Sequence, residues 1–276
     1  MLRDKELQIR ALHNIGELKR RVGNPQGSVQ VLKRATAMAA GFHPDAHRAA
    51  RGVLAISQLA AGQASDARDT ASSLLSEARA CGDRAEQSVA LGVLAGVAFE
   101  RGDYETSARM YRAASRLNMN HPQHHHEDLC GIMEAHAAAG RWRPTVRAAQ
   151  AAVDHAQAKG FEASVWPSLL RAARWYLDRK APKRAAILTF PAWAIAAQAS
   201  SRRHRSRHGT EPDLIADSHF PEAVITTAFH VLWGGHEPAA DFYESVISRF
   251  ELEDNTPLRT AILSARDAAA AANSKK

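Results

Sequence analysis

One glycine-centred pattern returns four times along this chain at a nearly constant distance. Gly23, Gly62, Gly102 and Gly140 lie 39, 40 and 38 residues apart, and each follows an Ala-rich apolar segment. A fixed period of this length is typical of stacked supersecondary units, each of which buries its apolar face against its neighbours. In a chain of 276 residues, the repeat therefore favours one elongated array over two separate globular domains.

The apolar residues around each glycine follow helical spacing. In the third unit Leu91 and Leu94 precede the glycine, and Ser107, Tyr111 and Ala114 follow it. Spacings of three and four place such residues on one helix face, and the glycine is expected to close the first helix of each unit with a left-handed backbone. No stretch alternates at period two, and the apolar share is rich in small Ala, which lets helices pack closely. The sequence therefore predicts an all-α protein.

The third unit also carries a family resemblance. The stretch from Leu91 to Ala114, which includes GDYETSARMYRAA, resembles the tetratricopeptide repeat. The usual repeat has about 34 residues, and the longer period here is similar to that of arrays attached to bacterial signal-dependent transcription activators. The resemblance implies an α-solenoid of about six helix-turn-helix units with a C-terminal capping helix. In the fifth unit Lys180 replaces the glycine.

The predicted array is a single superhelical domain over residues 1–276, with an insertion between its fifth and sixth units. The units lie near 5–43, 44–82, 83–120, 121–160, 161–199 and 217–252, the basic loop spans 200–216, and the capping helix spans 256–272.

Charge and targeting signals limit the classes of protein. There is no apolar leader segment and no run of about 18 apolar residues, so we expect a cytoplasmic protein without a membrane span. Cys81 and Cys130 give no disulfide framework. Residues 1–51 hold ten Lys/Arg against four Asp/Glu, whereas the last sixty hold five against nine. The opposite signs leave head-to-tail self-association open beside an ordinary solvated surface.

A histidine cluster is the first candidate for chemistry. His121, His124, His125 and His126 lie together in HPQHHHED. Adjacent histidines on a helix point about 100° apart, so they do not converge on one ion without loop geometry. We therefore expect a polar turn, with a metal site as the alternative, and we predict no cofactor. The sequence contains no nucleotide-binding loop or nucleophile elbow, so we predict no catalytic residue and no enzyme.

The basic loop is a second candidate. Arg202, Arg203, Arg205 and Arg207 could contact phosphates or an acidic protein. No aromatic residues interleave with them to stack on bases. A solvated or protein-docking loop is therefore the favoured interpretation, and nucleic-acid binding is the alternative.

The resemblance implies a binding groove, because the first helices of tetratricopeptide units line a concave surface. This sequence lacks the Lys and Asn pattern with which such arrays clamp a peptide carboxylate, so an acidic chaperone tail is not the expected ligand. Glycines on this face permit close approach of a bound peptide or helix, or alternatively tight packing between long helices. The implied groove residues are His13, Glu17, Gly52, Ile56, Gly92, Gly96, Cys130, Glu134, Leu170, Arg174, Ile225 and Phe229.

The sequence thus predicts a non-enzymatic protein–protein interaction scaffold that binds a peptide or a helix in its concave groove. The alternative is the sensing array of a bacterial transcription regulator, which would bind a small effector or a signalling peptide.

Overall fold

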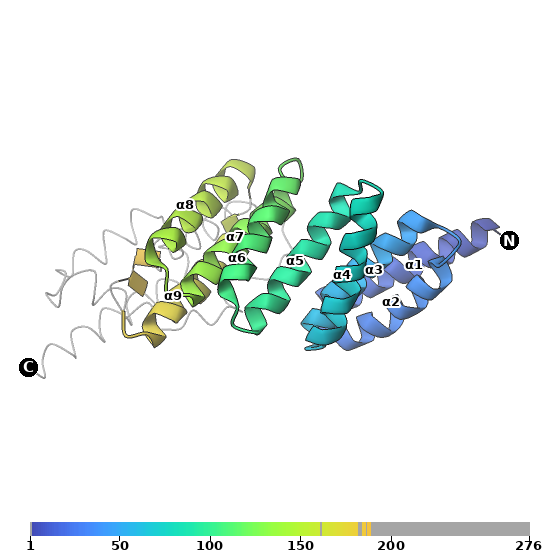
Figure 1. Ribbon diagram of the computed structural model, residues 1–276, viewed down its shortest axis with the longest axis horizontal. Helices are drawn as coiled ribbons and strands as arrows, with labels where there is room; N and C mark the ends of the chain where they lie inside the picture. The colour runs from blue at the N-terminus through green and yellow to red at the C-terminus, as the bar shows by residue number, and fades with distance from the viewer. Residues whose placement is uncertain (1, 161, 182–183, 186, 189–276) are drawn as a thin grey trace, which may run out of the picture. The chain divides into compact units, whose positions relative to one another are not determined.

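The computed structural model describes residues 2–160, 162–181, 184–185 and 187–188, and within these residues the chain forms nine α-helices and no strand. The helices are α1 (Leu2–Arg21), α2 (Pro25–Ala39), α3 (Pro44–Ala60), α4 (Ala64–Ala80), α5 (Arg84–Glu100), α6 (Tyr104–Leu117), α7 (Pro122–Ala138), α8 (Trp142–Lys159) and α9 (Glu162–Asp178). Short turns join them, and Figure 1 shows them as successive hairpins. The predicted all-α fold of helix-turn-helix units is confirmed.

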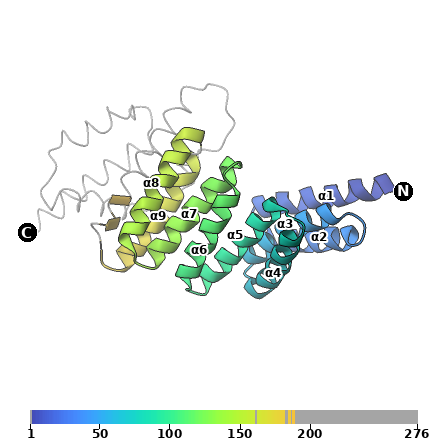
Figure 2. The same cartoon turned by 45° about the horizontal axis from the view of Figure 1, so that its top comes forward.

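The chain divides into two compact units, Met1–Ala135 and His136–Lys276. In the first unit each helix packs against the next, and α3 also contacts both α1 and α5. Figure 2 shows these helices from a second side. We call α1, α3, α5 and the first-unit part of α7 the odd-helix layer. A single superhelical domain over the whole chain stays a prediction.

The helices begin at residues that cap them. The side chains of Asn24, Asp83 and Asp103 each accept a hydrogen bond from the backbone N–H three residues ahead, at 2.9, 3.1 and 3.1 Å. Each bond satisfies one of the amide groups that a helix leaves unpaired at its start. Pro25 and Pro44 occupy the first helical position, where the missing N–H costs nothing. Local sequence therefore fixes where these helices start.

The repeated glycines end the first helix of each pair. Gly23, Gly62, Gly102 and Gly140 have φ angles of 81°, 73°, 78° and 71°, which confirms their predicted role. Lys180, which replaces the glycine of the fifth unit, also has a positive φ, of 55°. The helix end therefore requires a left-handed residue even where the sequence supplies a side chain that disfavours it.

Small side chains fill the core of the first unit. Ala55, Ala67, Ala71 and Ala90 are fully buried in a cluster that spans α3 to α6, together with Leu74. Because alanine adds little bulk, the helix axes approach closely along these rows. The Ala-rich composition is thus a packing requirement of the stack.

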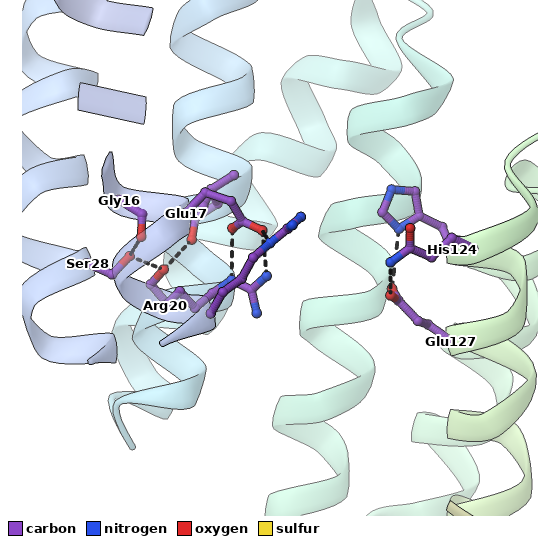
Figure 3. Close-up of polar contacts among 10 residues, drawn as sticks. Gly16, Glu17, Arg20, Ser28, His124 and Glu127 are labelled. Atoms are coloured by element: carbon purple, nitrogen blue, oxygen red, sulfur yellow. Dashed lines mark hydrogen bonds and ion pairs between the residues drawn. The ribbon is translucent and has the colours of Figure 1, made fainter. Parts of the chain in front are cut away.

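A buried hydroxyl joins the first three helices. Ser28 on α2 donates to the carbonyl oxygen of Gly16 on α1 at 2.7 Å, and its Oγ lies 2.8 Å from the Oγ of Ser57 on α3. Figure 3 includes the Ser28–Gly16 contact. The pairing satisfies polar groups that would otherwise be costly to bury.

In the second unit, α8 and α9 pack around an aromatic pair. Tyr176 on α9 is only 1% exposed, and its hydroxyl lies 2.9 Å from the hydroxyl of Thr145 on α8. The ring of Trp142 meets the Tyr176 ring edge-on, with centroids 5.2 Å apart. These contacts hold the two helices together as a pair.

The predicted sixth unit, the basic loop 200–216 and the capping helix 256–272 lie outside the described residues. In the described part of the chain, no helix has the length and apolarity needed to cross a membrane.

Candidate functional site

A half-open pocket of about 180 Å³, which we call the cavity, lies among α3, α5, α6 and α7 of the first unit. Liquid water occupies about 30 Å³ per molecule, so this volume is well above that of a single water. The lining residues come from all four helices and are Leu59, Gly96, Phe99, Glu100, Tyr111, Gly131 and Glu134. The walls therefore combine apolar and aromatic side chains with two carboxylates.

Two glycines give the cavity its shape. A Cβ atom added at Gly96 would lie 2.5 Å from Cδ2 of Leu59, and one added at Gly131 would lie 2.8 Å from two ring atoms of Tyr111. Both separations are shorter than ordinary van der Waals contact. The missing side chains thus let Leu59 and Tyr111 lie directly against α5 and α7.

The hydroxyl of Tyr111 adds a polar group to the cavity wall. Burial raises the pKa of this hydroxyl to about 12, and the negative charges of Glu134, Asp128 and Glu100 act in the same direction. The phenol therefore stays protonated at physiological pH and can donate a hydrogen bond.

Gly92 provides an open position beside the cavity. It lies one helical turn before Gly96 on α5, so the two share a helix face. Among the residues that the structure describes, no heavy atom lies within 4 Å of a Cβ placed at Gly92. The two glycines therefore differ, because neighbouring side chains cover Gly96 and leave the space at Gly92 free.

Charged pairs from α1 and α7 line the odd-helix layer at its two ends. Glu17 accepts hydrogen bonds from Arg20 at 2.9 and 2.7 Å and from Arg21 at 2.7 Å, whereas Nδ1 of His124 lies 3.3 Å from Glu127 (Figure 3). The hydrogen bond from Arg20 lowers the pKa of Glu17, and the bond to Glu127 raises the pKa of His124. Arg20 also interacts electrostatically with Glu127, and His124 with Glu17.

The structure brings three predicted groove residues together. Gly96 and Glu134 both line the cavity, and Gly92 adjoins it on α5. Two others, His13 and Glu17, lie on α1, where burial lowers the pKa of His13. The groove itself stays a prediction.

Three other groove candidates in the first unit, Gly52, Ile56 and Cys130, take part in its packing, and Ile56 among them is half-buried. The carboxyl of Glu86 lies over Gly52, since a Cβ there would be 2.6 Å from its Oε2. Ile56 packs against the core cluster of α3 to α6. Cys130 is buried, with Sγ 3.6 Å from Nε2 of His126. These side chains contribute to packing within the unit.

The remaining candidates lie elsewhere. Leu170 and Arg174 are on α9 in the second unit, where Arg174 pairs with Asp178 at 3.2 Å. The candidates outside the described residues are Ile225, Phe229, Arg202, Arg203, Arg205 and Arg207.

The expected polar turn is wrong for His124, His125 and His126, which lie within α7 and have different neighbours. Nδ1 of His125 lies 3.0 Å from Oγ of Ser115, His126 is buried beside Cys130, and His124 faces Glu127. Across the described residues, no three or more His, Cys, Asp or Glu side chains are grouped so that they could hold a metal ion. Divergence of adjacent side chains around α7 explains this dispersal.

Glu86 makes the stability of the first unit depend on pH. Burial, and then the charge of Asp83, raises its pKa from 4.5 to about 7. The folded chain thus binds a proton more tightly than the unfolded chain between these values, so the free energy of unfolding falls as pH rises through this window. Glu86→Gln removes the titrating carboxyl group, and with it this fall in the free energy of unfolding. The free energy of unfolding of the variant, minus that of the unsubstituted protein, should therefore be about 1–2 kcal/mol larger at pH 8 than at pH 5. Partial exposure of Glu86 keeps this difference below the value that the whole pKa shift would give.

Urea unfolding of both proteins at the two pH values measures this difference. Asp66→Asn, at an exposed carboxylate on α4, is the matched control and should show no such change between pH 5 and pH 8. If Glu86→Gln and the unsubstituted protein differ in stability by the same amount at both pH values, the raised pKa of Glu86 is contradicted.

Five cavity residues were missed in the sequence: Leu59, Phe99, Glu100, Tyr111 and Gly131. Phe99 and Glu100 lie three and four residues beyond Gly96, so helical spacing could have added them to the predicted face. Tyr111 comes from the second helix of its pair, whereas the groove residues were predicted from the first helices alone. Its proximity to Gly131 depends on how α6 packs against α7.

No protein-family model and no curated protein matches this chain. Among solved structures, it is similar to the nearly identical TPR-like repeats of a putative kinesin light chain from Podosopora anserina, at 19% identity and a TM-score of 0.53. That match covers 71% of this chain and 97% of the other. It is also similar to the apo form of RapI, at 12% identity and a TM-score of 0.57, over 98% of this chain and 100% of RapI. The chain therefore has the fold of the tetratricopeptide-like repeat proteins.

Proposed function

We propose that this protein is a non-enzymatic interaction scaffold that binds a peptide or a helix of another protein on its odd-helix layer, beside Gly92. The observation that carries the proposal is the open space at Gly92 next to a cavity of about 180 Å³ on the same face of α5. A backbone without a side chain permits close approach of a second chain, and the adjoining cavity offers room for one anchoring side chain.

The fold supports the same proposal. Stacked helical hairpins expose a long, regular surface, and arrays of this kind commonly use such a surface for binding. The charges of Glu17, Arg20, His124 and Glu127 at the ends of the layer add polar groups that could fix the register of a bound segment.

The Gly92→Arg variant tests the proposal. It should fold as the unsubstituted protein does, because the space at this position is open and glycine within a helix costs about 1 kcal/mol relative to alanine. The arginine side chain would occupy the surface where the partner lies. We expect the dissociation constant for a partner captured from source lysate to rise at least about tenfold.

Ser72→Arg is the matched control, since it places the same side chain at an exposed position on α4. Circular dichroism checks that both variants are folded, and biolayer interferometry measures the affinity. Equal binding by all three proteins would place the partner elsewhere. If no protein is captured and a small molecule binds saturably instead, the sensing array is the better description.

A further inference from the structure

We propose that α1 carries a second interaction surface, an exposed apolar stripe on which an amphipathic helix of a partner protein docks, with acidic residues beside its own apolar side chains. The members of this α1 stripe are Leu7, Ala11, Ile15, Leu18 and Val22. The stripe is separate from the site at Gly92, because it lies on a different helix, and either surface can bind without the other.

Exposed apolar side chains gather on this helix. Among the residues that the structure describes, six large apolar side chains are exposed, and four of them belong to the α1 stripe: Leu7, Ile15, Leu18 and Val22, at 62, 45, 61 and 70%. Ala11 is exposed as well. Apolar residues that are exposed singly are ordinary, whereas a contiguous group of them marks a contact surface.

The stripe lies on the side of α1 that faces away from its neighbours in the first unit. At about 100° per residue, its five side chains fall within an arc of about 80°. Ile9, nine residues before Leu18, lies on the opposite side and is 2% exposed. The helix packs against α2 and α3, and Figures 1 and 2 show it at one end of the first unit. The exposed face is therefore open to a further helix.

The spacing of the stripe suits a helix better than an extended peptide. From Ala11 to Val22 its members are separated by four, three and four positions, the spacing with which two helices interlock in a coiled coil. A helical hydrogen bond from the N–H of Val22 to the carbonyl oxygen of Leu18, at 3.0 Å, keeps Val22 in line with the others. From Leu7 to Val22 the stripe is about 22 Å long, or about four helical turns.

The charges beside the stripe indicate an acidic partner. Residues 9–22 hold four Lys/Arg against one Glu. Lys19 and Arg21 border the stripe on its two sides, about 40° beyond its outer members. Glu17 accepts hydrogen bonds from both Arg20 and Arg21, so two arginines share a single negative charge. Carboxylates on the partner would complement this surface, since charges at such flanking positions set the choice of partner in coiled coils.

The same charges disfavour a second copy of this chain as the occupant. Two α1 stripes packed against each other would bring two net positive surfaces together, and like charges in contact weaken an interface. A helix with acidic flanks meets no such repulsion.

The test uses two fluorescein-labelled peptides of three heptads, with Ile at a, Leu at d, and either Glu or Lys at every e and g position. Each peptide repels copies of itself and therefore stays monomeric. Fluorescence anisotropy measures their binding to the full chain. We expect the acidic peptide to bind saturably, and the basic peptide to bind at least about tenfold more weakly.

Variants assign the binding to the α1 stripe. The Ile15→Gln, Leu18→Gln double variant keeps every charge and should weaken binding of the acidic peptide at least about tenfold. Met119→Gln is the matched control, because Met119 is a 71% exposed apolar residue between α6 and α7, and it should bind as the unsubstituted protein does.

Reversal of charge tests the flanks of the stripe. The Lys19→Glu, Arg21→Glu double variant should bind the basic peptide more tightly than the acidic one. Circular dichroism checks that each variant is folded. Should either double variant fail to fold, Val22→Gln alone tests the stripe, because Val22 follows the last residue of α1 and is 70% exposed. Its expected effect is about threefold.

Other outcomes would overturn the inference. They are equal binding of the two peptides, binding unaffected by the stripe variants, and absence of saturable binding. Self-association in sedimentation experiments that Ile15→Gln, Leu18→Gln abolishes would make the stripe an interface between copies. Binding to phosphatidylserine vesicles, lost in the same variant while neither peptide binds, would make it a membrane surface. If Gly92→Arg prevents binding of the acidic peptide, that peptide occupies the proposed site at Gly92 and the α1 stripe is not its receptor.

Discussion

The Leu32→Ala variant is expected to lose about 3–5 kcal/mol of its free energy of unfolding. Leu32 on α2 is fully buried and packs with Val29 and with Leu54 of α3. It also lies over Gly16 of α1, where a Cβ atom would come within 2.5 Å of its Cγ. Truncation would therefore leave a cavity where three helices meet. Urea unfolding followed by circular dichroism measures the loss.

Gly16 provides a second variant that tests the packing directly. Gly16→Ala alone should be destabilising, because the new methyl group collides with Leu32 at a cost of about 1–3 kcal/mol, which exceeds the gain of about 1 kcal/mol in helix propensity. In the Leu32→Ala background the same methyl group enters vacated space. We expect the double variant to be about 1–2 kcal/mol more stable than the sum of the single effects. Strict additivity would mean that the two residues are not in contact.

Loss of the Arg48 guanidinium should have the second largest effect. Its side chain on α3 is largely buried, bonds to Asp45, and lies 3.2 Å from Asp83 and 3.6 Å from Glu77. Arg48 thus links α3 to α4 and to the start of α5. Arg48→Met keeps the apolar stem but leaves Asp45 and Asp83 without this cation, whereas Glu77 keeps its ion pair with Arg51 at 2.6 Å. We expect a loss of about 2–4 kcal/mol. The loss stays below that of a fully buried pair because Asp45 is exposed to water.

Arg68→Met is the control for this experiment. Within the described part of the chain, Arg68 pairs only with its exposed neighbour Asp69, at 2.8 Å, so its loss should change stability by no more than about 0.5 kcal/mol. Arg48→Lys should fall between the two, since lysine keeps the charge but not the planar fork that bonds to several acceptors. If Arg48→Met unfolds at the same urea concentration as Arg68→Met, the buried cluster contributes no net stability.

The local course of the chain could be predicted from its sequence. Glycines at a period near 39 residues, with small and apolar residues at helical spacing around them, indicated the helix-turn-helix units and the all-α fold. Even the fifth unit follows the rule, because Lys180 adopts the left-handed backbone that the glycine has elsewhere. Such features depend on interactions within a few residues, namely caps, turns and the face that a helix buries.

The candidate site could be predicted only in part. Gly92 and Gly96 are both glycines on the same face of α5, so the sequence predicted one role for both. Packing separates them, because Leu59 of α3 covers Gly96, whereas no described side chain lies within 4 Å of a Cβ at Gly92. Glu134 was among the predicted groove residues. Tyr111 was not, because the Tyr111 ring reaches the cavity from α6, the second helix of its pair.

The sequence by itself therefore determined the helices, their ends and the faces that they bury, because these follow from short-range chemistry. Only the tertiary structure decided which glycine is covered and which is open, and which carboxylates meet an aromatic ring. Those outcomes depend on contacts between helices whose residues lie 20 to 40 positions apart in the chain, which is about one helix to one full repeat. The periodicity within a single helix does not determine such contacts.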